Sequence, residues 1–204
     1  MKQKVLLDID GVLADFFAGF GGHINKFIGT NLDLTQGPNE YSIHEWAQNI
    51  PKEDIDNEIP KWIISGGYKD IPIYPGAKEF TYKLMDKYDV LIVTARLGDF
   101  RIDFSQELMD IIKNDTQKWF QNHGIPGENL LFEHHKVEFC KNNGIFSIVE
   151  DKFATVEKAA QEGLNAILMS RNWNKNDGLK VNHPNIHIAN NYDDILTMLE
   201  GIYG

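Results

Sequence analysis

The sequence predicts an α/β fold, in which a doubly wound, Rossmann-like parallel sheet carries a small helical cap inserted after the first strand. Three observations predict it. Short apolar runs rich in β-branched residues recur along the chain, and amphipathic segments separate them. One long stretch lacks such a run. Because the runs are continuous and do not alternate with polar residues, they are typical of strands covered by helices on both faces.

The strands and helices are expected to alternate along most of the chain. Glycines follow several of the amphipathic segments, at Gly124, Gly144 and Gly163, and glycine there is a common helix stop. Strand, helix and strand repeated in this way predict a right-handed doubly wound sheet. The predicted strands are 5–9, 90–94, 130–132, 146–149 and 166–169, and the helices between and after them are 77–87, 104–123, 137–143, 155–162 and 193–199.

Residues 16–71 break this alternation. They contain helix-like segments at 16–28, 43–48 and 54–64, together with turn residues, and no run typical of a buried strand. The stretch is too long for a structureless loop in a compact domain. We therefore expect a helical cap over 16–71, inserted into an α/β core formed by 1–15 and 72–204.

Composition excludes several classes of protein. The chain has 204 residues, 42% of them hydrophobic, a formal net charge of −10 and a single cysteine. The acidic charge argues against binding a nucleic-acid polymer, which uses clustered Lys and Arg, but one site could still hold a small anion. No apolar run reaches the ~20 residues of a membrane span. We expect a cytoplasmic protein without a membrane partner, and the sequence leaves a homodimer open.

Acidic residues stand where two of the predicted strands end. The first strand leads into Asp8 and Asp10, followed by Gly11, and the fourth into Glu150 and Asp151. Since ligands of open α/β sheets bind beyond the carboxyl ends of the strands, these carboxylates should converge there. A lone Asp at such a place is usually a cap or turn residue, whereas two acidic pairs are harder to obtain by chance. A cluster of oxygen ligands without Cys or His indicates a hard divalent ion, here Mg²⁺.

Candidates for holding an anion lie near the same edge. Thr94 ends the second predicted strand with a hydroxyl group, and Ala95 follows it with a backbone N–H. Lys136 stands at the head of a short helix after the third strand. These groups are expected to hold the anionic group of a ligand that the metal also contacts.

These motifs resemble those of the haloacid-dehalogenase-like (HAD) phosphohydrolase superfamily. VLLDIDGVLADFF is similar to its first motif, LIVTAR to the second and SIVEDKFATV to the fourth, with Lys136 as the third. The resemblance is strongest to the 5′(3′)-deoxyribonucleotidases of phage and bacterial type. Ala95-Arg96 replaces a Ser-Pro of the animal enzymes, and Glu150-Asp151 replaces Asp-Asp.

The resemblance implies a mechanism. Asp8 is the nucleophile that forms a phospho-aspartyl intermediate, and Asp10 is the general acid and base. Mg²⁺ is held by the Asp8 carboxylate, the Asp10 backbone carbonyl and Asp151. Glu150 acts on the ion through a bound water molecule or supports the residues that bind it. The substrate is expected to be a small phosphomonoester, a nucleoside monophosphate.

Aromatic residues suit such a substrate. Phe16 and Phe17 follow the first strand and could stack on a nucleobase, with Arg96 as a further substrate contact. The alternative is that the aromatic side chains form the core of the cap. Two other functions stay open: the same chemistry on a sugar phosphate or a nucleic-acid 3′-phosphate end, and a non-catalytic binding module on the same fold.

Overall fold

A parallel sheet forms the centre of the protein. The computed structural model describes residues 2–35, 37–98, 104–178 and 182–204. Within these ranges the sheet has six strands, all parallel, in the order β3-β2-β1-β4-β5-β6. Because the chain winds outward from β1 in both directions, the order confirms the predicted doubly wound α/β fold. The strands are β1 (Lys4–Leu7), β2 (Asp89–Thr94), β3 (Leu130–Phe132), β4 (Ser147–Glu150), β5 (Asn165–Met169) and β6 (Ile186–Ala189).

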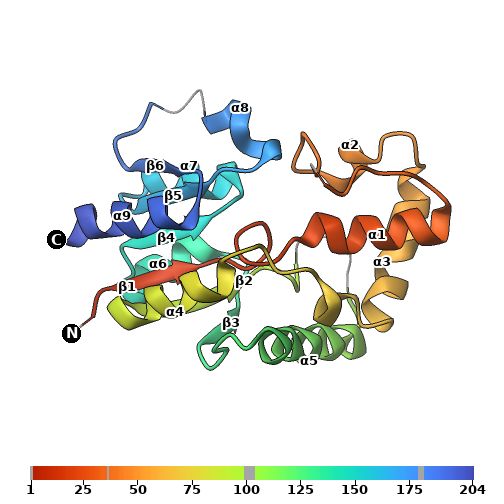
Figure 1. Ribbon diagram of the computed structural model, residues 1–204, viewed down its shortest axis with the longest axis horizontal. Helices are drawn as coiled ribbons and strands as arrows, with labels where there is room; N and C mark the ends of the chain where they lie inside the picture. The colour runs from red at the N-terminus through yellow and green to blue at the C-terminus, as the bar shows by residue number, and fades with distance from the viewer. Residues whose placement is uncertain (1, 36, 99–103, 179–181) are drawn as a thin grey trace.

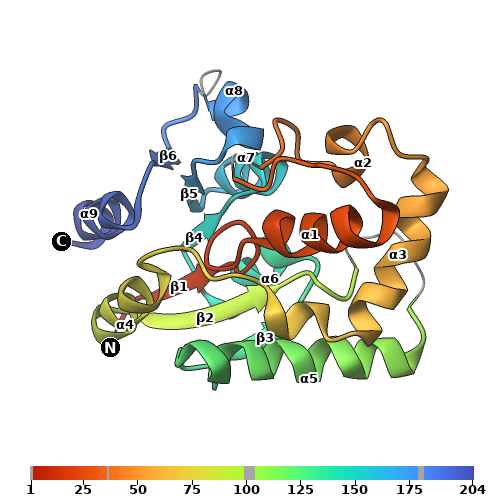
Figure 2. The same ribbon diagram turned by 45° about the vertical axis from the view of Figure 1, so that its right-hand side comes forward.

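Helices cover both faces of the sheet. The helices α4 (Ala77–Lys87), α5 (Gln106–His123) and α9 (Tyr192–Tyr203) share one apolar cluster with Val5 and Leu7 of β1. The helices α6 (Lys136–Asn143) and α7 (Phe153–Gln161) share another with Leu6. This alternation is the two-residue period of a strand, and it explains why β1 is apolar throughout. Figures 1 and 2 show the sheet between its helices.

The sixth strand is absent from the sequence prediction. The five predicted strands are present with slightly different ends, and β6 lies beside β5 at the edge of the sheet. Its sequence is short, contains His187, and is only partly buried. Because His187 interrupts its apolar residues, β6 lacks the continuous apolar run by which the other strands were recognised.

After β1 and before α4, the chain forms a group of helices. These are α1 (Phe16–Ile28), α2 (Ile43–Trp46), α3 (Lys52–Ile64) and the 3₁₀ helix η1 (Gly67–Asp70). They lie beyond the carboxyl ends of the strands (Figure 1), and α3 and η1 pack on α5. The indole of Trp119 in α5 donates a hydrogen bond to the Ile71 carbonyl (2.7 Å). The boundary of a cap at 16–71 stays a prediction, because one apolar cluster joins these helices to the sheet.

Local chemistry sets the ends of α1. The Asp15 side chain accepts a hydrogen bond from the Ala18 N–H (3.0 Å), which caps the helix at its start. Gly29 ends it in the left-handed conformation (φ 79°), and its N–H donates to the Asn25 carbonyl. Among the helices of the described residues, none has both the length and the apolar composition needed to cross a membrane.

Candidate active site

Three buried carboxylates meet at the carboxyl edge of the sheet. Asp8 directly follows β1, Glu150 ends β4 and Asp151 follows it. The Asp8 N–H donates to the Val149 carbonyl (3.1 Å), which ties the two strand ends together. One oxygen from each carboxylate lies within 4.8 Å of the others. In this strand order β1 and β4 flank the point where the winding reverses, which is where doubly wound sheets bind ligands.

Lys136 lies between two of these carboxylates. It is the first residue of α6 and is buried, and its Nζ is 2.6 Å from Asp8 Oδ1 and 2.8 Å from Glu150 Oε2. Burial disfavours the charged ammonium, but the charges of Asp8 and Glu150 outweigh it, and the pKa of Lys136 is raised. The lysine is therefore cationic and offsets one of the three negative charges.

The remaining charge of the cluster suits a divalent cation. Burial, and then the charge of Asp8, raise the pKa of Asp151 to about 8 and the pKa of Glu150 well above its ordinary value. A bound cation would remove the cost of ionising these groups. All the ligand atoms are carboxylate oxygens, which are the donors that Mg²⁺ takes in proteins. Asp8, Glu150 and Asp151 therefore fit a magnesium ion, and the Asp10 side chain stands apart because it pairs with Arg96.

Asp151 is held in place from the loop after β5. The indole Nε1 of Trp173 donates to Asp151 Oδ2 (2.8 Å), and Asn174 Nδ2 donates to the Asp151 carbonyl (2.7 Å). Asn174 also donates to the Met169 carbonyl (2.9 Å) at the end of β5. In the sequence alone, residues 171–174 could contact a ligand because they follow a predicted strand, but a plain connecting loop is the simpler interpretation. Its place after a strand was the available signal, but the partner of the indole could not be read from the sequence.

The turn after β1 brings the first motif against Asp151. Gly11 has φ 76°, and a side chain there would place its Cβ 2.2 Å from Asp151 Oδ2. Arg171 fixes this turn: its Nε donates to the Gly11 carbonyl (2.6 Å) and its Nη2 to the Val12 carbonyl (3.2 Å). The Arg171 guanidinium also lies over the Tyr74 ring, 3.7 Å from its centroid. The structure thus requires glycine at position 11 for both its conformation and its space.

We expect Gly11→Ala to lower activity at least tenfold and Gly163→Ala to leave activity unchanged. Gly163 has φ 84° and no atom within 4 Å of an added Cβ, so both variants share the backbone cost of about 1–2 kcal/mol. Only the alanine at position 11 also displaces Asp151. Turnover rates and thermal melting of the two variants test this. Equal rates in both would contradict a role for close packing at the turn.

The predicted phosphate-binding residues line a small polar cavity. Thr94 ends β2, and its Oγ1 accepts a hydrogen bond from the Arg96 N–H (3.3 Å). The cavity measures about 110 Å³ and adjoins the carboxylates. His134 and Thr155, which the sequence did not indicate, also contribute to its wall. The lining residues are Asp8, Asp10, Tyr41, Thr94, Ala95, His134, Lys136, Glu150, Lys152 and Thr155.

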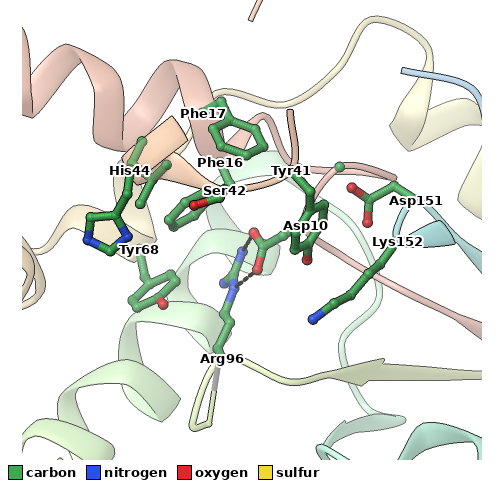
Figure 3. Close-up of a pocket in the computed structure, with 12 residues that line it drawn as sticks. Asp10, Phe16, Phe17, Tyr41, Ser42, His44, Tyr68, Arg96, Asp151 and Lys152 are labelled. Atoms are coloured by element: carbon green, nitrogen blue, oxygen red, sulfur yellow. Dashed lines mark hydrogen bonds and ion pairs between the residues drawn. The ribbon is translucent and has the colours of Figure 1, made fainter. Parts of the chain in front are cut away.

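A larger cavity of about 330 Å³ adjoins the small one, and Asp10, Tyr41 and Lys152 line both. The sequence-predicted substrate contacts Phe16, Phe17 and Arg96 line it, as Figure 3 shows. Five of its residues were not indicated by the sequence. Tyr41, Ser42, Ile43 and His44 come from irregular or short segments, and Lys152 follows the acidic pair of the fourth motif without an assigned role. Tyr68, one of the aromatic residues of the predicted cap, also lines the cavity.

The two predicted substrate-contacting phenylalanines differ in their packing. Phe17 is buried and its ring packs on Trp46 (5.7 Å between centroids) and Trp173 (4.9 Å). Phe16 is partly exposed, and its ring meets Trp62 edge to face (5.5 Å). Phe17 therefore also serves as core, which was the alternative considered for these aromatic side chains, while Phe16 keeps surface toward the cavity.

Comparison with known families gives one match that spans nearly the whole chain. The model of the family described as 5′ nucleotidase, deoxy (pyrimidine), cytosolic type C protein (NT5C) matches residues 2–192. This range includes every candidate site residue named above. No curated protein matches the chain in sequence.

Solved structures share the fold at low sequence identity. A haloacid dehalogenase-like family hydrolase from Streptococcus pneumoniae has a TM-score of 0.61 at 15% identity, covering 97% of this chain and 98% of its own. A HAD family hydrolase from Deinococcus radiodurans, with bound phosphate and sodium, has a TM-score of 0.60 at 14% identity (98% and 96%). The D,D-heptose 1,7-bisphosphate phosphatase from B. bronchiseptica, complexed with magnesium and phosphate, has 0.54 at 12% (98% and 99%).

Proposed function

The chain belongs to the NT5C family of 5′ nucleotidases and is a phosphoric monoester hydrolase with a HAD fold, and from that premise we propose that it is a Mg²⁺-dependent nucleotidase that hydrolyses deoxyribonucleoside monophosphates. The observation that carries this proposal is the pair of adjoining cavities. One is small and polar, and Asp8 and Lys136 lie in its wall. The other is larger and lined by aromatic rings. In a nucleoside monophosphate, the phosphate would suit the small polar cavity and the flat base would suit the larger one.

The small cavity supports phosphoryl transfer to Asp8. A carboxylate oxygen of Asp8 attacks phosphorus, the bond to the ester oxygen breaks, and that oxygen takes a proton from Asp10. Water activated by Asp10 then releases phosphate from the aspartyl intermediate. Thr94, the Ala95 N–H and Lys136 orient the phosphoryl oxygens and offset their charge.

Magnesium supports this chemistry electrostatically. Asp8, Asp151 and the Asp10 carbonyl would hold the ion, with Glu150 placed to act through water and fixed by its contact with Lys136 (2.8 Å). When bound, the ion supplies positive charge beside the transferring phosphoryl group. Trp173 and Asn174 keep Asp151 in place for it.

The larger cavity supports a nucleoside over a sugar. Phe16 and Tyr41 line it with rings that are only partly covered, and stacking on a base contributes about 1–3 kcal/mol. Ser42 and His44 add a few polar groups, with His44 Nε2 2.8 Å from Asp56 Oδ1. An apolar pocket with few polar groups is typical of small-molecule sites. A sugar phosphate would leave the aromatic walls without a partner.

A substrate panel tests the proposed function. We expect dUMP and dTMP to be hydrolysed with a kcat/KM at least tenfold above that of glucose 6-phosphate or a 3′-phosphorylated oligonucleotide. EDTA should abolish turnover, and MgCl₂ should restore it. Faster turnover of the sugar phosphate or the oligonucleotide would contradict the nucleotide assignment while leaving the phosphatase chemistry in place.

A further inference from the structure

Arg96 makes an unusually complete set of contacts with Asp10. Its Nε donates to Asp10 Oδ2 (2.7 Å) and its Nη2 to Asp10 Oδ1 (2.6 Å), so the guanidinium engages both oxygens, as Figure 3 shows. Two parallel N–H···O bonds of this kind fix the direction of a carboxyl group as well as its place. Arg96 follows β2 and Asp10 follows β1, and the pair spans 86 residues of sequence.

Other elements hold the Arg96 guanidinium itself. Its Nη1 donates to Thr116 Oγ1 (3.0 Å) in α5, and that hydroxyl donates to the Ile112 carbonyl (2.7 Å). On one face the guanidinium lies over the Tyr68 ring of η1, 4.6 Å from its centroid. Two elements outside the catalytic loops therefore keep Arg96 in place.

Burial distinguishes the roles of the two partners. The Arg96 side chain is 1% exposed, whereas the Asp10 side chain keeps 24% of its surface and lines both cavities. Arg96 lines only the larger cavity and is almost fully covered, so it lies behind the carboxylate as seen from the small polar cavity. A group in that place serves the reaction through Asp10 more than by its own contact with substrate.

We propose that Arg96 is a positioning residue that aims the Asp10 carboxyl group at the ester oxygen of the substrate. The inference rests on the proposed role of Asp10 as general acid. As a carboxylate, Asp10 accepts both N–H groups. When it carries a proton, one oxygen still accepts from Arg96, and the other directs its O–H to the ester oxygen. The proton passes to that oxygen as the P–O bond breaks, and Asp10 regains both contacts.

The positioning role of Arg96 is tested by how strongly the rate of ester hydrolysis depends on the basicity of the leaving oxygen. The series p-nitrophenyl phosphate, phenyl phosphate and benzyl phosphate has similar shape and increasingly basic leaving oxygens. Loss of a directed acid matters little for p-nitrophenolate and greatly for an alkoxide. The parameter compared is kcat/KM, because it covers the steps up to transfer to Asp8 and excludes the later hydrolysis that all three esters share.

We expect Arg96→Met to lower kcat/KM about 100-fold for benzyl phosphate, and about fivefold or less for p-nitrophenyl phosphate. Arg96→Lys should recover part of the loss, since an ammonium reaches one oxygen but not both in parallel. Thr116→Val, which removes the acceptor on α5 and lines neither cavity, should steepen the leaving-group dependence in the same direction by a smaller factor. This variant keeps the test available if Arg96→Met does not fold.

Arg171→Met is the matched control. Arg171 holds backbone carbonyls of the turn after β1 and makes no contact with Asp10 among the described residues, so its removal should slow all three esters by the same factor. An equal loss across the series in Arg96→Met would overturn the positioning role. A wild-type enzyme that cleaves these esters but no nucleoside monophosphate would instead overturn the nucleotide assignment, and the Arg96 result would still stand.

Discussion

Replacing Asp8 by Asn is expected to lower turnover by roughly 10⁴-fold or more while the protein remains folded. The amide is neutral and a poor nucleophile, so no aspartyl phosphate can form. Lys136 keeps its contact with Glu150 Oε2 (2.8 Å), and removing one charge relieves repulsion, because Asp8 raises the pKa of both Glu150 and Asp151. Steady-state rates, circular dichroism and thermal melting check both parts of this expectation.

Asp89→Asn provides a matched control for Asp8→Asn. Asp89 is an exposed carboxylate at the other end of the sheet, where β2 begins, and its replacement should leave the rate unchanged. Acid-quenched wild-type enzyme should yield a phosphorylated peptide that contains Asp8, and the Asp8→Asn variant should not. Wild-type turnover by purified Asp8→Asn would remove Asp8 as the nucleophile.

The fold was predictable because the central strands are chemically distinctive. Strands such as β1 and β4 are covered on both faces, so they need continuous apolar runs, and these are visible in a single sequence. The parallel topology then brings Asp8, Glu150 and Asp151 to one edge without any knowledge of side chains. β6 was missed because it is only partly buried and His187 interrupts its apolar residues.

The contacts that orient the site could not be predicted in the same way. Trp173 reaches Asp151 and Arg96 reaches Asp10 through tertiary contacts between segments far apart in the sequence. Tyr41 and His44 enter the larger cavity from irregular or short segments, which have no periodicity to indicate a buried face. A motif identifies the residues at the end of a strand, whereas their partners depend on the packing of side chains that a single sequence does not fix.

The pH dependence of magnesium binding is expected to follow from the carboxylate cluster. Asp151 has an ordinary pKa of 3.8, and burial together with the charge of Asp8 raises it to about 8. Between these values the metal-free folded protein binds more protons than the unfolded chain. Its free energy of unfolding therefore falls as the pH rises from about 4 to about 8. Bound magnesium takes the place of the proton on Asp151, so the free energy of unfolding of the magnesium-bound protein does not fall in this way.

The stabilisation by magnesium should consequently increase from pH 6 to pH 8. For one buried carboxyl group the increase is roughly 2 kcal/mol, which corresponds to about 4–8 °C in the melting temperature of a chain of this size. EDTA-treated protein, melted with and without MgCl₂ at pH 6, 7 and 8, measures it. In Asp151→Asn the increment should vanish, because the amide neither titrates nor carries charge for the ion. A magnesium shift that stays constant or decreases with pH would show that the ion binds elsewhere, since binding at Asp8, Glu150 and Asp151 must displace the protons that burial keeps there.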